Sequence, residues 1–392
     1  MRHIDTEIVK VDAANEHHAS SAPIYLSATF HHTSLNDQHD YIYSPKGNPT
    51  RTDLERHLAK IMGNASFVFA VHTGGNAFEV LSRLLMPGDE VIADKSVFVA
   101  SSRWLGYLEA QQGVHTHYVD TTDVSEVTTK LNERTRFVMV ESPTNPLYRI
   151  CDIQAISRAV KASEFGNNVI IVADNTMTSP MNANPFELGV DIWYESGTKF
   201  LSGHHDITAG VLAVNDREIA KKLAFVVSEA GAGLDAFNSW MLLRGLKTLS
   251  VRFERQQQNA IQVGNFLMEV GPTLKVPKFE LLWGGNPDMV GYDVHKRNTR
   301  GPGAILVFRT HDMDISQKIV DGVQLYSIGM SFGAVDSLIS MPLLSAQKMG
   351  GAGSSANRES LPADIVRLSI GIENAGDLVD DLRKAFEKAG AL

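Results

Sequence analysis

Short runs of β-branched and apolar residues alternate along the chain with longer stretches in which apolar residues recur at helical spacing. Such alternation is typical of a mostly parallel sheet covered by helices, so the predicted fold class is α/β. The runs expected to form strands are residues 66–71, 90–93, 116–119, 137–141, 169–173, 191–195 and 210–214. The helices expected between them include residues 77–85 and 101–112.

A helix is predicted before the first strand. Pro49 suits its first turn, apolar residues from Leu54 to Ile61 recur at helical spacing, and Gly63 ends it. The preceding residues 1–42 are polar and weakly periodic. We therefore expect them to form an N-terminal arm rather than a domain.

The pattern changes toward the C-terminus. Residues 242–270 are predicted to form one or two helices, and shorter strands and loops then lead to an amphipathic helix at residues 376–389. We expect a large domain over residues 43–250 and a smaller α+β domain over residues 251–392. The glycine- and serine-rich residues 350–355 are interpreted as a surface connection, with a lid as the alternative.

Composition narrows the class of protein. The 392 residues are 43% hydrophobic and 21% charged, as in globular proteins, and the net charge of −9 argues against a nucleic-acid partner. Cys151 is the only cysteine, which predicts a reducing compartment. The start MRHIDTEIVK lacks the features of a secretory signal, and no run approaches the ~20 apolar residues of a membrane span. We expect a cytoplasmic enzyme with a small-molecule substrate and no membrane partner.

Three pairs of adjacent histidines raise the question of a metal site: His17-His18, His31-His32 and His204-His205. Neighbouring residues point in different directions on a helix or a strand, so such pairs rarely bind one ion. The cysteine and histidine spacings of zinc sites are also missing from the sequence. We expect no metal.

The chemistry is concentrated in two segments. Ser196-Gly197-Thr198-Lys199 follows a predicted strand, although a short motif of this kind alone usually marks a solvated turn. Asp174 ends another predicted strand, and pyridoxal-5′-phosphate (PLP) needs a carboxylate that faces its pyridine nitrogen. Together they predict a PLP enzyme in which Lys199 holds the cofactor as a Schiff base. The alternative for Asp174 is that it caps the following turn.

Two turns add polar groups. Asn145, in the turn Glu141-Ser142-Pro143-Thr144-Asn145-Pro146, is a candidate to bind the phenolic oxygen of PLP, although two prolines equally indicate a rigid turn. The turn Thr73-Gly74-Gly75-Asn76 lies between a predicted strand and a helix. Its backbone N–H groups suit a phosphate at a helix N-terminus, and the alternative is a plain tight turn.

The chain resembles the Cys/Met-metabolism family of PLP enzymes over nearly its whole length. The segments that carry the resemblance are Leu54–Met62 (LERHLAKIM), Tyr194–Asp206 (YESGTKFLSGHHD) and Ile365–Glu373 (IVRLSIGIE). Within this family, which includes cystathionine γ-synthases and γ-lyases, they are most similar to fungal-type cystathionine β-lyases. The resemblance implies PLP fold type I, which is aspartate-aminotransferase-like, and a homotetramer of two tight dimers. It also implies that the arm contacts the neighbouring subunit.

The resemblance assigns a role to each candidate site residue. The expected catalytic residues are Lys199, Tyr43 and Phe98; Asp174 would pair with the pyridine nitrogen, and Phe98 would stack on the ring. The phosphate would be held by Ser196, Thr198, Thr73, Gly74 and Gly75. Arg367 would clamp the substrate α-carboxylate through a bidentate pair, with Asn145, Ser331 and Met330 beside it. Tyr43 would reach across the dimer to the cofactor of the neighbouring subunit.

Three positions depart from the family pattern. Pro45 follows Tyr43-Ser44 where relatives carry an arginine, and Lys46 does not reproduce a guanidinium fork. Phe98 replaces a tyrosine and loses a hydroxyl that can move protons. Gly75 stands where relatives carry methionine. Since these changes surround the substrate, we hypothesise that the side chain cleaved is not a standard diacid thioether.

The predicted activity is that of a PLP-dependent lyase, which eliminates a heteroatom leaving group from an amino-acid side chain by carbon–sulfur cleavage like that of cystathionine β-lyase. Met330 stands where relatives acting at Cγ often carry an acid, which disfavours an ordinary cystathionine γ-lyase or γ-synthase. The alternatives are a γ-lyase for methionine-, homoserine- or canavanine-type substrates, a γ-replacement synthase, and a catalytically quiet homologue.

Overall fold

A computed structural model of the protein describes residues 3–13, 17–37, 39–348 and 361–392. Its helices are α1 (Ile4–Val9), α2 (Pro49–Ile61), α3 (Gly74–Ser82), α4 (Val99–Gln112), α5 (Val124–Thr128), α6 (Ile153–Ala162), α7 (Ser179–Asn182), α8 (Arg217–Glu229), α9 (Ala236–Leu246), α10 (Leu249–Val270), α11 (Tyr292–Asn298), α12 (Met313–Gly322), α13 (Pro342–Lys348) and α14 (Ala375–Lys388). Short 3-10 turns lie at Gly166–Asn168, Pro185–Leu188 and Gly271–Thr273. The stretch 350–355, interpreted as a connection or lid, is outside the described residues.

The large sheet has seven strands in the order β1-β7-β6-β5-β4-β2-β3. They are β1 (Phe67–Val71), β2 (Glu90–Asp94), β3 (His115–Val119), β4 (Thr135–Glu141), β5 (Ile170–Asp174), β6 (Ile192–Ser196) and β7 (Gly210–Val214). β7 runs antiparallel to both of its neighbours, and the other pairs in this sheet are parallel. The expected mostly parallel sheet is confirmed, and each predicted strand lies within one or two residues of an observed one.

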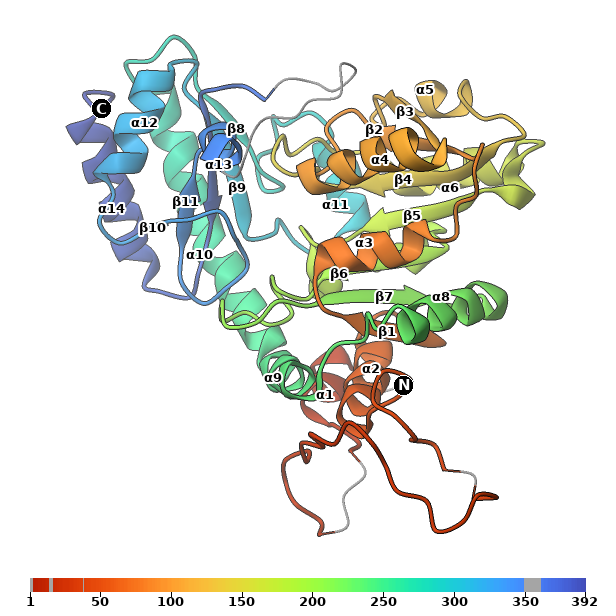
Figure 1. Cartoon of the computed structure of the whole chain (residues 1–392). Coiled ribbons are helices and arrows are strands. Elements are labelled where there is room, and N and C mark those ends of the chain that lie inside the picture. Colours follow the sequence, from red (N-terminus) through yellow and green to blue (C-terminus); the bar gives the residue numbers. More distant parts are fainter. Residues whose placement is uncertain (1–2, 14–16, 38, 349–360) are drawn as a thin grey trace.

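The two faces of the large sheet are covered by different helices, as Figure 1 shows. Met139 and Val172 point into the core formed with α3, α4 and α8, whereas Val138 and Ile171 point into the core formed with α5 and α6. Side chains alternate between the faces of a strand. Asp174, two residues after Val172, therefore lies on the α3 side.

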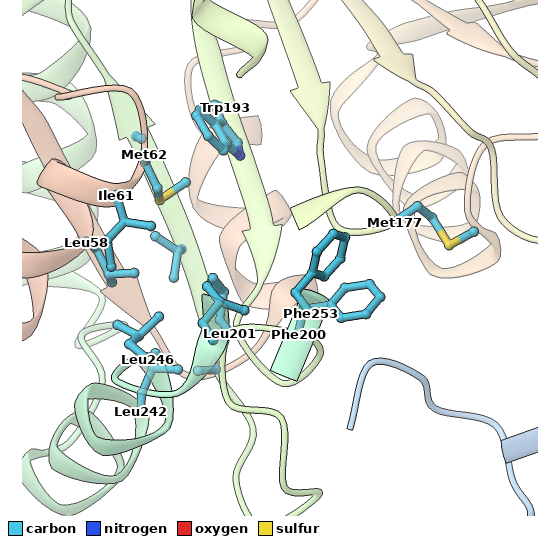
Figure 2. Packing of buried hydrophobic residues seen from close by; sticks show 14 of the residues in the cluster. Leu58, Ile61, Met62, Met177, Trp193, Phe200, Leu201, Leu242, Leu246 and Phe253 are labelled. Carbon is cyan, nitrogen blue, oxygen red and sulfur yellow. The ribbon is translucent and has the colours of Figure 1, made fainter. Parts of the chain in front are cut away.

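A further hydrophobic core anchors the loop that carries Lys199. Figure 2 shows Leu201 near side chains of α2 and α9, and Phe200 beside Phe253 of α10. The ring centroid of Phe200 lies 5.1 Å from that of Phe253 and 5.9 Å from that of Phe332. Because removing a buried aromatic ring of this size costs about 3–5 kcal/mol, this packing holds the backbone beside Lys199 firmly.

The smaller sheet has the order β10-β11-β12-β9-β8. Its strands are β8 (Glu280–Leu282), β9 (Ile305–Arg309), β10 (Ser327–Ile328), β11 (Leu338–Ser340) and β12 (Ile365–Ser369), all antiparallel except the pair β10–β11. Side chains of α10, α12 and α14 pack with this sheet in one core. A second, smaller C-terminal sheet with helices confirms the predicted α/β fold class.

The structure shows features of the N-terminal segment and of the junction between the two sheets that the hydrophobic pattern did not predict. α1 lies within the predicted arm, and its Ile8 is fully buried in the chain's own core. The segment that follows projects away from the large sheet (Figure 1). α10 contacts α1 and α7 as well as β9 and α14, so the division between residues 250 and 251 stays a prediction. None of the described helices is long and apolar enough to cross a membrane.

Candidate active site

The candidate site lies where three neighbouring strands of the large sheet end. Glu141, Asp174 and Ser196 are the last residues of β4, β5 and β6. Glu141 and Asp174 are direct partners in the parallel register. Ligands of open α/β sheets bind outside the carboxyl ends of the strands, so this edge is the expected place for a cofactor.

Lys199 lies in the loop after β6. Its Nζ donates a hydrogen bond of 2.8 Å to Ser331 Oγ and lies 5.2 Å from the ring centroid of Phe332. Burial, together with the charge of Arg367, lowers the pKa of Lys199 from 10.5 to about 8. The neutral amine is thus roughly two orders of magnitude more abundant at pH 7 than for an ordinary lysine, which makes Lys199 an activated nucleophile.

Arg367 on β12 reaches the same place from the smaller sheet. Its Nη1 donates to Asn145 Oδ1 at 2.9 Å, and its Nη2 donates to the carbonyl oxygens of Met330 and Ser331 at 2.7 and 3.2 Å. Its Cζ lies 5.3 Å from the centroid of Phe332. Among the described residues no carboxylate forms an ion pair with this buried guanidinium, which suits it to bind a carboxylate from outside.

Asp174 takes one of the two roles that the sequence left open, and its pairing with a pyridine nitrogen stays a prediction. Its Oδ1 accepts hydrogen bonds from the backbone N–H of Thr176 at 2.9 Å and from the Thr176 hydroxyl at 2.5 Å, so it does cap the following turn. Burial raises the pKa of Asp174, and the two Thr176 hydrogen bonds oppose that rise. Capping therefore stabilises the carboxylate form that a pyridinium nitrogen requires.

The predicted phosphate-binding turn forms the start of α3. Thr73 is the N-cap, and its Oγ1 accepts from the backbone N–H of Asn76 at 2.9 Å. A methyl group on Gly74 would lie 3.0 Å from Ser196 Cβ and 3.2 Å from Ser196 Oγ. Glycine allows this approach without displacing Ser196, and the approach brings the Ser196 hydroxyl against a helix N-terminus. Gly75 has no such constraint, because a methyl group there would meet only Thr73 Oγ1, at 3.7 Å.

The side chains of the remaining predicted residues are exposed or already have other hydrogen bonds, although the Met330 carbonyl accepts from Arg367. Thr198 Oγ1 accepts from Ala209 N at 3.0 Å and donates to Ala209 O at 3.3 Å, so its hydroxyl already bridges the loop to the chain before β7. Phe98 is the residue before α4 and is 38% exposed. Met330 and Tyr43 are also exposed, and Tyr43 belongs to the projecting N-terminal segment.

Two residues of this centre were missed from the sequence. Glu141 ends β4 just as Asp174 ends β5, and that shared position was the available signal. The ring centroid of Phe332 lies 5.2 Å from the amine of Lys199 and 5.3 Å from the guanidinium carbon of Arg367. The position of Phe332 in the site depends on contacts between segments that are distant in the sequence, so no local sequence pattern predicts it.

The groups present fit PLP. The site offers an activated amine, a carboxylate at the end of a mostly buried strand, and a serine hydroxyl that packs closely against the first glycine of a helix. An aldehyde, a pyridine nitrogen and a phosphate are the matching groups of this cofactor. In the described parts of the chain no group of three His, Cys, Asp or Glu side chains is arranged to hold a metal.

Comparison with known proteins gives the same assignment of class. The family model described as "Cys/Met metabolism PLP-dependent enzyme" matches residues 5–387. A cystathionine β-lyase of Neurospora crassa is 47% identical over 387 residues, which are 99% of this chain and 82% of that protein. A cystathionine β-lyase of Schizosaccharomyces pombe is 39% identical over 392 residues, covering 98% of this chain and 97% of that protein. The crystal structure of cystathionine γ-lyase from Lactobacillus plantarum complexed with L-serine has a TM-score of 0.92 at 28% identity and covers 100% of both chains.

Proposed function

Because the chain belongs to the Cys/Met-metabolism family of PLP-dependent enzymes, we propose that it is a carbon–sulfur lyase of the cystathionine β-lyase type. Its substrate is an amino acid with a sulfur leaving group on the side chain. β-Elimination from cystathionine, with uptake of water, releases homocysteine, pyruvate and ammonia. Met330, in place of an acid, favours this reaction over ordinary cystathionine γ-cleavage.

One observation carries the proposal: an activated amine and a guanidinium that has no carboxylate partner in the described parts of the chain both bond the same short segment. Lys199 Nζ bonds the Ser331 hydroxyl and Arg367 bonds the Ser331 carbonyl, with the ring of Phe332 about equally far from both cations. An α-carboxylate bound at Arg367 brings the Cα of an amino acid toward Lys199. This arrangement supports amino-acid chemistry at Cα.

Residues from several elements would hold the cofactor. Lys199 would bind it covalently, Asp174 would pair with its ring nitrogen, and Phe98 would stack on the ring. Ser196, Thr73, Gly74 and Gly75 would hold the phosphate group, together with Thr198, whose hydroxyl would have to exchange its hydrogen bond to the Ala209 carbonyl for one to the phosphate. When bound, PLP supplies the electron sink that accepts negative charge from Cα.

The chain's own residues then orient the substrate and move its proton. Arg367 holds the α-carboxylate through two parallel hydrogen bonds, and Asn145 fixes the guanidinium plane. The Lys199 amine, whose pKa of about 8 leaves a sizeable neutral fraction at pH 7, takes the proton from Cα. The Ser331 hydroxyl accepts a hydrogen bond from that amine and keeps it directed into the site.

We propose further that the enzyme is a cytoplasmic homotetramer of two tight dimers, with domains at residues 43–250 and 251–392. In the assembly the arm of residues 1–42 covers the neighbouring subunit, and Tyr43 contributes to that subunit's cofactor site. Support comes from the apolar side chains that the N-terminal segment exposes in the single chain: Ile24, Tyr25, Leu26, Leu35, Ile42 and Tyr43. Apolar patches of this kind mark protein interfaces.

The missing arginine at Pro45 bears on substrate choice. Arg51 Nη2 donates to the carbonyl oxygens of Ser44 and Pro45 at 3.1 and 3.3 Å, so this backbone is fixed but offers no cation of its own. The Lys46 amine instead lies 4.0 Å from Glu229. We therefore hypothesise that thioethers without a distal carboxylate are cleaved at least as well as cystathionine.

A substrate panel tests the proposed function. The PLP-loaded enzyme is supplied with cystathionine, cysteine, methionine, homocysteine, O-acetylhomoserine or canavanine, and with S-methylcysteine as a β-thioether that has no distal carboxylate. The keto acid is identified by mass spectrometry. Pyruvate from a β-thioether is the expected product. Turnover confined to γ-substituted substrates, with 2-oxobutyrate as product, would replace the β-lyase with a γ-lyase, and products formed only with an added thiol would indicate a γ-replacement synthase. No turnover of any substrate would indicate a catalytically quiet homologue. Cystathionine as the best substrate by a wide margin would contradict the hypothesis on Pro45.

A further inference from the structure

Glu141 is a buried carboxyl group that the proposed chemistry does not use. It is 4% exposed, and its Oε1 accepts a hydrogen bond from the backbone N–H of Asn145 at 2.9 Å. Its Oε2 is buried and has no hydrogen-bond partner in the described parts of the chain. A buried, charged carboxylate oxygen without a donor is costly, so this geometry favours the uncharged acid.

We infer that Glu141 is a positioning residue that stays protonated and fixes the turn carrying Asn145, and through it the guanidinium of Arg367. The bond to Asn145 N closes the turn after β4, and Asn145 Oδ1 in turn accepts from Arg367 Nη1 at 2.9 Å. The end of β4 thereby sets the plane in which Arg367 meets a substrate carboxylate. This inference rests on the proposed function, because it assigns Glu141 a part in the same amino-acid site.

The groups around Glu141 explain why it, rather than Asp174, carries a proton. Burial, and next the charge of Asp174, raise the pKa of Glu141 well above its ordinary value. Asp94 adds to the rise, and the backbone amides of Asn145 and Phe98 oppose it. Asp174 faces Glu141 at the same register but has two hydrogen bonds from Thr176 to stabilise its charge. Two neighbouring buried carboxyls do not both ionise readily. An uncharged Glu141 leaves the single negative charge on Asp174, where the ring nitrogen needs it.

The test compares wild-type enzyme with Glu141→Gln and Glu141→Ala, each loaded with PLP. Glutamine keeps an acceptor for Asn145 N and is never charged, whereas alanine removes the acceptor. The probes are L-alanine, which has an amino group and a carboxylate but no leaving group, and ethylamine, which lacks the carboxylate that Arg367 binds. Binding is followed by the change in the visible absorbance of bound PLP, and the pH midpoint of that absorbance is recorded without ligand.

The expected result separates the two variants. Glu141→Gln binds L-alanine within about threefold of wild type and keeps the pH midpoint, whereas Glu141→Ala binds it at least about tenfold more weakly, as loss of a buried hydrogen bond predicts. Ethylamine binds all three equally. Unfolding curves of the apo forms show whether the Ala variant is folded. If it is not, the L-alanine affinity and the pH midpoint of the Gln variant alone test the inference.

Two results would overturn the inference. A Gln variant that binds L-alanine weakly or shifts the pH midpoint would show that Glu141 acts through a charge. A folded Ala variant with wild-type affinity for L-alanine would show that Glu141 does not position the clamp. Wild-type enzyme that develops no visible absorbance with PLP would instead overturn the proposed function, and this inference with it.

Discussion

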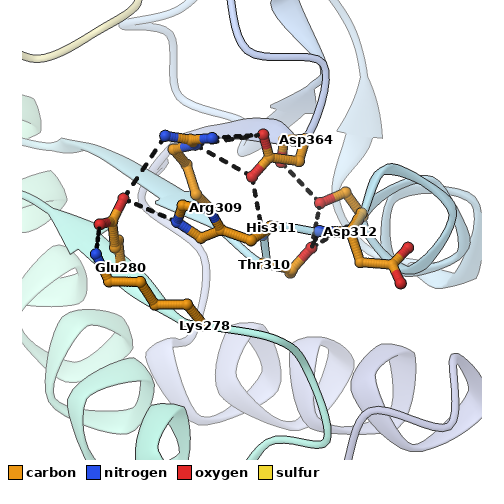
Figure 3. A network of polar contacts seen from close by, with 8 residues as sticks. Lys278, Glu280, Arg309, Thr310, His311, Asp312 and Asp364 are labelled. Carbon is orange, nitrogen blue, oxygen red and sulfur yellow. Dashed lines mark hydrogen bonds and ion pairs between the residues drawn. The ribbon is translucent and has the colours of Figure 1, made fainter.

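Two clusters of charged side chains in this molecule are built in opposite ways. In the smaller sheet, Arg309 donates three hydrogen bonds of 2.9–3.3 Å to the two oxygens of Asp364, and the backbone N–H of His311 adds a fourth at 2.9 Å (Figure 3). At the candidate active site, Lys199 and Arg367 have no carboxylate partner among the described residues. Neither cation of the site therefore has an oppositely charged partner of the kind that Arg309 finds in Asp364.

The pKa directions reflect this difference. Burial acts to raise the pKa of Asp364, but the hydrogen bonds from Arg309 and the His311 amide outweigh it and the pKa is lowered. For Glu141 and Asp174 burial wins and the pKa is raised, and for Lys199 burial lowers it. We conclude that the ion pairs around Asp364 stabilise the fold. The site around Lys199 instead keeps the protonation states that catalysis needs, at a cost in folding stability.

The largest effect is expected at Lys199. In Lys199→Ala the visible absorbance of bound PLP should disappear and turnover should fall by at least about a thousandfold, because the covalent attachment and the proton carrier are both lost. The midpoint of thermal unfolding of the apo form should not fall, since a desolvated amine is removed. A visible absorbance band that survives the substitution would contradict the assignment of Lys199.

Arg367 should affect substrate binding next most strongly. Arg367→Lys keeps the charge but loses the planar fork, so we expect KM for the amino-acid substrate to rise roughly 10- to 100-fold, with kcat much less affected. Steady-state kinetics with the best substrate of the panel measures this. Should kcat fall while KM stays constant, Arg367 would belong to the chemical step rather than to carboxylate binding.

Substitution of Asp364 should lower stability and leave catalysis almost unchanged, the opposite of what is expected at Lys199. Asp364→Asn removes the carboxylate that Arg309 bonds most closely and leaves it only Glu280, at 3.7 Å, so the free energy of unfolding should fall by about 2 kcal/mol while kcat/KM stays near wild type. Because its pKa is lowered in the folded state, its contribution is present above the ordinary carboxyl pKa and is lost as the pH falls through the folded value.

Denaturant unfolding at pH 7 and at pH values below the ordinary carboxyl pKa of 3.8 measures this contribution. The matched control is Lys278→Ala, which removes the exposed partner of Glu280 in the same cluster and should change stability by less than about 1 kcal/mol. An Asp364→Asn variant as stable as this control would show that the paired cluster contributes little.

The smallest expected effect is the pH dependence of the rate at which Lys199 binds PLP. Lys199 must be neutral to attack an aldehyde, and its pKa is about 8 in the folded chain. The rate at which the apo form acquires visible absorbance on addition of PLP should therefore rise about tenfold for each pH unit below 8 and level off above it. A rate that keeps rising through pH 9.5 would show an ordinary lysine amine instead.

Much of the fold was predictable because local pattern decides it. The strands are runs of β-branched residues, and Pro49 and Gly63 bracket α2 as expected. α3 was predicted to start at Ala77 but starts at Gly74, because Thr73 caps it. α1 was not predicted, because six residues give too little periodicity and Ile8 gains its stability only from the distant core.

The residues of the site also fall into a group that local sequence predicted and a group that it did not. Lys199, Asp174 and Arg367 lie in segments with recognisable motifs, and the structure brings them to one edge of the large sheet. Glu141 and Phe332 have functional places only because β4, β5 and β12 converge, which a single sequence does not reveal. Position relative to distant elements, rather than residue type, was the missing information.

The central claim is that Lys199 is the residue that binds PLP. Loaded enzyme is treated with sodium borohydride, which fixes the cofactor to its lysine, then digested, and the peptides are sequenced by mass spectrometry. The account predicts a pyridoxyl modification on Lys199, with an unmodified Lys199→Ala control. Modification of a different lysine, or of none, would contradict it.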